Sequence, residues 1–367
     1  MLPWVALLSV LVGSAAADGS GGRIVFSGES KGVFHLFTVQ ADGSQLQPLT
    51  SYGSPIASTD AGGKTVVTPY CNDFTPSWSP DGSTVAFSRL ATRTYRVSSR
   101  REQPIYREAG ERKEEVEVDT GRGYSLLRVQ SNPILEFVGT KTIWETDVTS
   151  EAWVGIYVVD LVEKGTKPLF TFPVSSQCDS PTWSPDGNLL AFGLYDGTSY
   201  QIVVADPRLP FPQGEVMRWR GVDPDWSPTG PRVAFCTTNN EGSGLLPGAT
   251  IHFMDVRTAQ AMPLTSGAAA FSERHPRWSP DGKQIIFYRL GPTTADLVNL
   301  DIVTGKEATI ATALAAEQLN GPPCWSPDGT EIAFPIGGSI RVANVQTGDE
   351  RTIPTDKFAP YGLDWAN

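Results

Sequence analysis

Imidazole chemistry has few possible positions in this chain, because only three histidines occur in 367 residues. His275 follows two residues after Glu273, and an imidazole near carboxylates such as Glu273 and Asp223 can act as a general base or bind a divalent ion. His35 and His252 fall inside apolar stretches typical of strands, where a structural role is expected. Any histidine chemistry is therefore expected at His275.

A second pattern with chemical meaning is GESKG at 28–32, which matches the G-x-S-x-G of serine hydrolases. That motif activates its serine only on a strand-to-helix turn. Here the flanking segments RIVFSG and FHLFTV alternate like two strands, so Ser30 is expected in a β-hairpin loop. We therefore assign no catalytic residue to the motif.

The elements that position these residues are revealed by an internal repeat. Five copies occur: PSWSPDGSTVAF at 76–87, PTWSPDGNLLAF at 181–192, PDWSPTGPRVAF at 224–235, PRWSPDGKQIIF at 276–287 and PCWSPDGTEIAF at 323–334. Three of the four spacings between successive repeat tryptophans are 43 to 52 residues, the length of a propeller blade. The repeat therefore predicts a β-propeller.

Each repeat is expected to form a strand with the tryptophan, a tight turn, and a second, apolar strand. Pro suits the second position of a type I turn and Gly its end, so Ser-Pro-Asp-Gly is interpreted as a hairpin turn. The turn aspartates are therefore expected to form turns and are not nominated as metal ligands; they are Asp81, Asp186, Asp281 and Asp328. Two further apolar strands follow each hairpin and complete a four-stranded blade.

The sixth blade is divided between the two ends of the chain. Residues 23–50 supply three strands without a tryptophan strand, and the chain ends in YGLDWAN, with Trp365 placed 40 residues after Trp325. The sequence thus predicts an all-β, six-bladed propeller in which the C-terminal strand closes the ring by joining three N-terminal strands.

One spacing is anomalous, because 105 residues separate Trp78 from Trp183. The surplus, residues 91–151, interrupts a single hairpin of the second blade and is expected to be a long loop. The charges in it and just before it are segregated: Arg89, Arg93, Arg96, Arg100 and Arg101 come first, and Glu108, Glu111, Glu114, Glu115, Glu117 and Asp119 follow. A solvated extension and a protruding β-hairpin are the two alternatives.

Residues 1–17 resemble a signal peptide, since an apolar run from Val5 to Val12 precedes the small residues 15–17. Cleavage before Asp18 would leave residues 18–367 as the mature propeller in a periplasmic or extracellular location. No other stretch is long and apolar enough to span a bilayer. The net charge of -11 argues against nucleic acid as a partner.

Four cysteines would be allowed as disulfides in such a compartment, but their spacing ranks no pairing, and buried thiols explain them equally well. They are Cys71, Cys178, Cys236 and Cys324.

The residues just before each tryptophan strand are expected to ring one mouth of the central channel. They form the candidate ligand-binding site: Asp73, Thr75, Asp179, Ser180, Asp223, Glu273, His275, Asn320 and Tyr361. Such a polar ring suits a cation, a sugar or the end of a peptide. From hairpin topology, the 91–151 insertion is expected on the same face as this mouth.

The P-x-W-S-P-D-G segment followed by an apolar strand resembles the repeat of TolB-like β-propellers. The resemblance covers nearly the whole mature chain, without the N-terminal α/β domain of TolB. It implies a non-catalytic scaffold that binds a protein, peptide or cell-envelope component and needs no cofactor. The alternative is a metal-assisted hydrolase or lyase at the mouth around His275, although lyases with this repeat use several histidines. No metal ligand is assigned.

Overall fold

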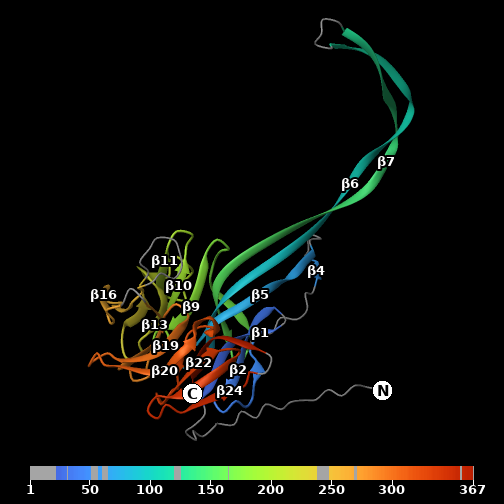
Figure 1. Ribbon diagram of the computed structural model, residues 1–367. Coiled ribbons are helices and arrows are strands. Elements are labelled where there is room, and N and C mark those ends of the chain that lie inside the picture. Colours follow the sequence, from blue (N-terminus) through green and yellow to red (C-terminus); the bar gives the residue numbers. More distant parts are fainter. Residues whose placement is uncertain are drawn as a thin grey trace, which may run out of the picture. The chain divides into compact units, whose positions relative to one another are not determined.

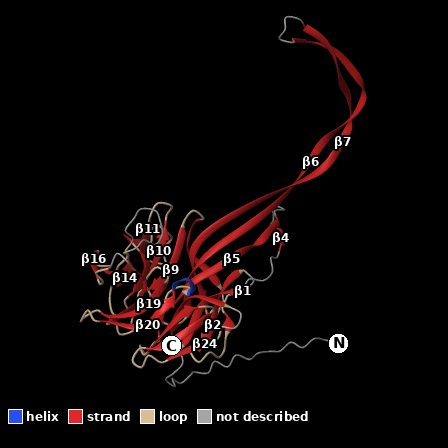
Figure 2. Cartoon of the chain, viewed as in Figure 1, coloured by secondary structure: helices blue, strands red, loops and turns tan. Residues whose placement is uncertain are grey.

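The computed structural model describes residues 22–30, 32–50, 57–59, 65–119, 125–163, 165–237, 248–267, 271–355 and 358–366. The expected signal peptide, residues 1–17, lies outside them. The chain divides into two compact units, one of residues 1–53, 70–91 and 152–367 and the other of residues 54–69 and 92–151. Strands dominate both units, as Figure 2 shows. No helix in the described part is long and apolar enough to cross a membrane.

The predicted six-bladed β-propeller is confirmed, because the strands form six antiparallel sheets that follow one another along the chain (Figure 1). The first blade combines the two chain ends and contains β25 (Ala359–Ala366), β1 (Arg23–Ser30), β2 (Val33–Gln40) and β3 (Gln47–Pro48). The second contains β4 (Ala57–Thr59), β5 (Thr65–Trp78), β6 (Thr84–Asp119), β7 (Ser125–Asp160) and β8 (Thr166–Pro173).

The other four blades have four strands each. The third contains β9 (Gln177–Trp183), β10 (Leu190–Tyr195), β11 (Tyr200–Ala205) and β12 (Glu215–Arg220), and the fourth β13 (Val222–Trp226), β14 (Arg232–Cys236), β15 (Ile251–Asp255) and β16 (Gln260–Pro263). The fifth contains β17 (Ser272–Trp278), β18 (Gln284–Leu290), β19 (Thr294–Asp301) and β20 (Glu307–Ala315), followed by the 3-10 helix η1 (Ala316–Gln318). The sixth contains β21 (Cys324–Trp325), β22 (Glu331–Ile336), β23 (Ser339–Asn344) and β24 (Glu350–Ile353).

Hydrogen bonds within the Ser-Pro-Asp-Gly turns show why the repeat folds as a hairpin. In the second blade Ser79 donates its hydroxyl to Asp81 Oδ1 at 2.6 Å, and the Ser83 amide donates to the same oxygen at 3.0 Å. Gly82 takes a φ of 68°, which a glycine adopts without strain. The same serine-to-aspartate bond forms at Asp186, Asp281 and Asp328. These aspartates therefore serve the turns, as predicted.

The core lies between successive blades. The phenylalanine that ends each repeat is at most 1% exposed, and this holds for Phe87, Phe192, Phe235, Phe287 and Phe334. One cluster joins Ile24 and Trp365 of the first blade to Ala333 and Val342 of the sixth. Apolar packing thus couples each blade to its neighbour and supplies most of the stabilisation of the ring.

Closure of the ring by the C-terminal strand is also confirmed. β25 pairs with β1 in an antiparallel register that runs from Arg23 opposite Ala366 to Glu29 opposite Ala359. The register shifts between Phe26 and Ser27, where Gly362 forms a bulge with a φ of 57°.

The long insertion of the second blade is strand where we expected a loop. β6 and β7 have 36 residues each and lie side by side in the sheet, so residues 92–119 and 125–151 form a two-stranded antiparallel ribbon. We call this part of the second unit the β6–β7 ribbon; Figure 1 shows it in cyan to green. The ribbon matches the hairpin alternative.

Candidate ligand-binding channel

A bulge three residues before the repeat tryptophan shapes the innermost strand of most blades. Thr75, Ser180, Asp223 and His275 all have φ values between 44° and 55°, and Gly362 holds the equivalent place in β25. Left-handed backbone is unusual for residues with a side chain and is strained for a β-branched threonine. Four of the nine predicted site residues thus occupy one special backbone position.

This conformation links neighbouring blades through the backbone amides at the bulge. The Ser180 amide donates to Thr75 Oγ1 at 3.0 Å, and the His275 amide donates to Asp223 Oδ2 at 3.3 Å. The Gly362 amide donates to the Asn320 carbonyl at 2.8 Å. The strain at the bulge is therefore offset by hydrogen bonds from one blade to the next.

Asp223 lies at the centre of a buried polar group. Its Oδ2 is 2.8 Å from Arg274 Nε and 3.3 Å from His275 Nδ1, although the imidazole contact lacks hydrogen-bond geometry. Burial opposes ionisation of Asp223, yet the Arg274 guanidinium and His275 hold its pKa well below the usual value. Asp223 is therefore a carboxylate that needs its guanidinium partner.

Asp179 and Tyr361 are open to solvent at the same place. Both side chains are exposed although protein atoms surround them, as expected for groups that line a narrow channel. Burial raises the pKa of Asp179 to about 6, the charge of Asp223 adds to this, and Arg274 opposes it. Burial, with Asp179 and Asp223, also raises the pKa of Tyr361. The charges of Asp179, Asp223, Arg274 and Tyr361 therefore influence one another.

Aromatic rings adjoin this charged group. The Tyr361 ring centroid lies 5.8 Å from that of Phe74 and 6.2 Å from that of Phe34, and the two phenylalanine rings are 4.8 Å apart. Such a cluster offers an apolar contact beside charged groups, a combination common at binding surfaces. Sequence analysis had included Tyr361 but had overlooked Phe34 and Phe74.

Asp73 lies in a buried ion pair and Glu273 in a partly buried one. Asp73 pairs with Arg89 at 2.7 Å and Glu273 with Arg289 at 2.7 Å, and in each case the arginine follows the acid by sixteen residues. Both acids also accept a hydrogen bond from a threonine at the end of the preceding blade, Thr50 or Thr265. These contacts hold one blade to the next.

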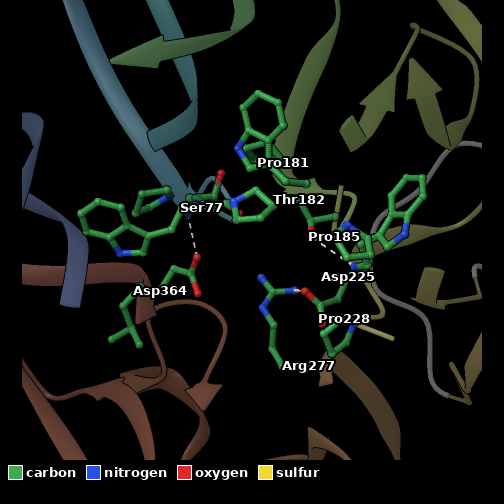
Figure 3. A pocket seen from close by; sticks show the side chains of 15 residues that line it. Ser77, Pro181, Thr182, Pro185, Asp225, Pro228, Arg277 and Asp364 are labelled. Atoms are coloured by element: carbon green, nitrogen blue, oxygen red, sulfur yellow. Dashed lines mark hydrogen bonds and ion pairs between the residues drawn. The ribbon is translucent and has the colours of Figure 1, made fainter. Parts of the chain in front are cut away.

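A cavity of about 370 Å³ lies where the tryptophan turns of several blades meet (Figure 3). Rigid proline and tryptophan side chains form much of its wall. Its polar lining comes from the residues immediately before the repeat tryptophans: Ser77, Thr182, Asp225, Arg277 and Asp364. Four of them stand at the one variable position of P-x-W-S-P and Asp364 directly precedes Trp365, a signal that could have identified these residues from the sequence.

The polar residues of this cavity also hold backbone amides of the following blade. The Trp78 amide donates to Asp364 Oδ2 at 2.8 Å, and the Trp278 amide donates to Asp225 Oδ2 at 2.7 Å. Burial raises the pKa values of Asp225 and Asp364 to about 6, with Arg277 acting against burial at both. Asp225 and Asp364 therefore each combine a structural hydrogen bond with an ionisable group in the cavity lining.

Comparison with known proteins agrees with this geometry. The family model of the TolB beta propeller domain matches residues 156–355, more than half of the chain. The chain belongs to the TolB beta propeller family. A search of curated protein sequences finds no match.

Solved structures share this fold. TolB from Acinetobacter baumannii is 16% identical, with a TM-score of 0.60 over 94% of this chain and 66% of that one. A chain of the nidogen/laminin complex is 9% identical, with a TM-score of 0.53 over 95% of this chain and 99% of that one. The TolB-like propeller thus spans 66% of the length of the Acinetobacter protein, and these low identities show the fold alone.

The described residues of this TolB-like propeller contain no group of three or more His, Cys, Asp or Glu side chains arranged to hold a metal ion. Ser30 ends β1 and is followed by the β1–β2 hairpin. All four cysteines are free, and burial raises the pKa of Cys71 to about 12. The described residues at the candidate site include groups for ion pairing, hydrogen bonding and aromatic contact.

Proposed function

We propose that this TolB-like propeller is a non-catalytic binding scaffold of the periplasm or the extracellular space, and that its channel mouth binds a protein, peptide or cell-envelope ligand. The observation that supports it is the solvent-exposed pair Asp179 and Tyr361 beside the buried Asp223–Arg274 ion pair. The resemblance of residues 1–17 to a signal peptide supports the location.

The chemistry of the mouth favours a peptide segment that carries a cationic or amide donor next to an apolar side chain. Arg274 already satisfies Asp223, whereas Asp179 is exposed to solvent and its carboxylate can accept a further donor. Tyr361, Phe34 and Phe74 offer an apolar surface on which an aliphatic or aromatic side chain can pack. A ligand would use both features if its ammonium or amide group binds Asp179 and its neighbouring apolar side chain packs on the aromatic rings.

Photo-crosslinking tests this proposal and identifies the ligand in the same experiment. A photoreactive phenylalanine in place of Tyr361 should capture a peptide or envelope component, whereas the same residue at Val303, 80% exposed in a distant turn, should not. Once the captured ligand is identified, Asp179→Asn should weaken its binding at least tenfold, and the exposed-turn variant Asp301→Asn should not. Equal binding by both variants would refute the proposal.

The competing proposal is a metal-assisted hydrolase or lyase, for which the 3.3 Å approach of His275 Nδ1 to Asp223 is the relevant geometry. Calorimetric titration with Zn²⁺ and Mn²⁺ distinguishes the two. Stoichiometric binding that disappears in His275→Ala would show a metal site at His275 and would favour the metal-assisted alternative.

A further inference from the structure

The cavity at the tryptophan turns contains opposite charges that do not satisfy each other. Arg277 Nη1 lies 3.7 Å from Asp225 Oδ1, which is too long for a hydrogen bond. Neither side chain is sealed from solvent, since Arg277 is 15% and Asp225 is 16% exposed. A guanidinium and a carboxylate therefore stand close together at a place that a small ligand can reach.

The Arg277 guanidinium keeps one edge available. Its Nη1 donates long hydrogen bonds to the carbonyl oxygens of Pro224 and Pro276, at 3.4 and 3.2 Å. Its Nε and Nη2 donate none to the residues that the structure describes. The same two nitrogens of Arg89 bind both oxygens of Asp73, at 2.7 and 3.1 Å. The free edge of Arg277 therefore matches the carboxylate of a ligand.

Two acidic side chains complete the charged part of the cavity. Asp225 and Asp364 both line it, and Figure 3 shows the Arg277 guanidinium in the space between them. Burial raises the pKa values of both acids to about 6, and Arg277 is close enough to act against burial at each. At neutral pH the described lining therefore carries two anions and one cation, and a bound ammonium would balance the charge.

Much of the remaining cavity wall is apolar. Trp78, Trp183 and Trp226 contribute to it, together with several prolines. Indole rings pack against aliphatic and aromatic groups and also attract cations. The volume of about 370 Å³ is at the lower end of the range for sites that bind small molecules. The cavity therefore suits a small molecule that combines an anion, a cation and an apolar body.

We propose that this cavity binds a free α-amino acid with an apolar side chain. The carboxylate of the ligand pairs with the Nε and Nη2 edge of Arg277, its ammonium pairs with Asp225, and its side chain packs against the tryptophans. An α-amino acid carries its two charges on neighbouring groups, as the short distance between Arg277 and Asp225 requires. The site is separate from the proposed ligand at the channel mouth, because neither Asp179 nor Tyr361 lines the cavity.

Isothermal titration calorimetry of the full chain at neutral pH tests the proposal, with L-leucine as the probe. We expect one leucine to bind per chain with a Kd of about 1 mM or below. Isoamylamine is leucine without its carboxylate, and isocaproate is leucine without its ammonium, so each should bind at least tenfold more weakly. These titrations use the wild-type protein and do not depend on the folding of any variant.

Two substitutions assign the charges of the ligand to their partners. Arg277→Met should weaken leucine binding at least tenfold and abolish the preference for leucine over isoamylamine. Asp225→Asn keeps an oxygen for the Trp278 amide and should weaken the binding of leucine but not of isocaproate. Arg208→Met, which breaks an exposed ion pair, is the control and should bind leucine like the wild type.

Circular dichroism of each variant controls for folding. Three outcomes would overturn the proposal: a wild type that does not bind leucine, equal affinity of the wild type for leucine and either analogue, or a folded Arg277→Met variant that binds leucine as tightly as the wild type.

Discussion

Arg274 is the partner that keeps Asp223 charged inside the propeller. Asp223 is 5% exposed and Arg274 14%, with 2.8 Å between them. Because Arg274→Met leaves a buried carboxylate without its cation, we expect a loss of about 3 kcal/mol in the free energy of unfolding. Urea titration measures it. Arg208→Met, which breaks an exposed ion pair with Asp206, is the control and should have almost no effect.

The cavity carboxylates give stability a pH dependence. Burial raises the pKa of Asp225 from 3.8 to about 6, so the folded protein holds a proton that the unfolded chain releases. The contribution of protonated Asp225 to the free energy of unfolding is fully present below pH 4 and is lost as the pH rises through 6. Asp225→Asn should therefore reduce the fall in stability between pH 4 and 7 by roughly 1–3 kcal/mol.

Urea titrations at several pH values check this prediction, with Asp301→Asn as the control. The pKa of Asp301 is lowered by backbone amides of its turn, so its removal should leave the decline between pH 4 and 7 in place. A wild-type protein whose stability is constant across that range would contradict the raised pKa values.

Ser180 tests the strain at the bulges. It has a φ of 48°, is buried, and its side chain makes no hydrogen bond to the residues that the structure describes. Ser180→Gly should stabilise the protein by about 0.5–1 kcal/mol because glycine adopts this conformation freely, whereas Ser180→Val should destabilise it by more than 1 kcal/mol. Thermal unfolding of both variants checks this; a destabilising glycine would show that the bulge is unstrained.

Residue types near each tryptophan could be selected from the sequence, but their environments could not. Asp73 and Asp179 are both aspartates just before a repeat tryptophan, yet one lies in a buried ion pair and the other opens to the channel. The sixteen-residue spacing of Asp73 and Arg89, and of Glu273 and Arg289, was visible in the sequence and would have indicated the ion pairs. No sequence pattern predicted the left-handed backbone of His275. This conformation arises from the bulge in β17, and no glycine marks the position.

At the scale of elements, β25 holds the two ends of the chain together. Its loss would expose β1 and leave the ring open. A chain that ends at Phe358 should therefore lose cooperative unfolding in urea, whereas removal of residue 367 alone should not. Retention of the full transition midpoint by the truncated chain would disprove closure as a source of stability.

The blades were predictable because turn chemistry and apolar alternation are local. W-S-P-D-G fixes a hairpin through its own serine, aspartate and glycine, so each copy places two strands in register. The ribbon was harder to predict. Its strands are charged for much of their length, and few apolar positions distinguish them from a solvated loop.

At the scale of the whole molecule, the two units should be separable. Unit boundaries fall at residues 91 and 152, and the adjoining residues Val85, Phe87 and Val159 belong to the propeller core. Replacement of residues 92–151 by Asn-Gly should leave a folded propeller with a melting temperature within a few degrees of the intact chain. Differential scanning calorimetry measures it, and an unfolded product would show that the units depend on each other.

Ring closure by β25 also sets a timetable for synthesis. β1 leaves the ribosome early, but its partner is encoded in the last residues of the chain. At about 5–20 residues per second, roughly 20–70 s pass between the two. Throughout that interval β1 has one unpaired edge that any nascent strand of similar pattern can occupy. A slowly translated or stalled message therefore prolongs the period in which this protein can aggregate, and premature chain termination yields molecules that cannot close.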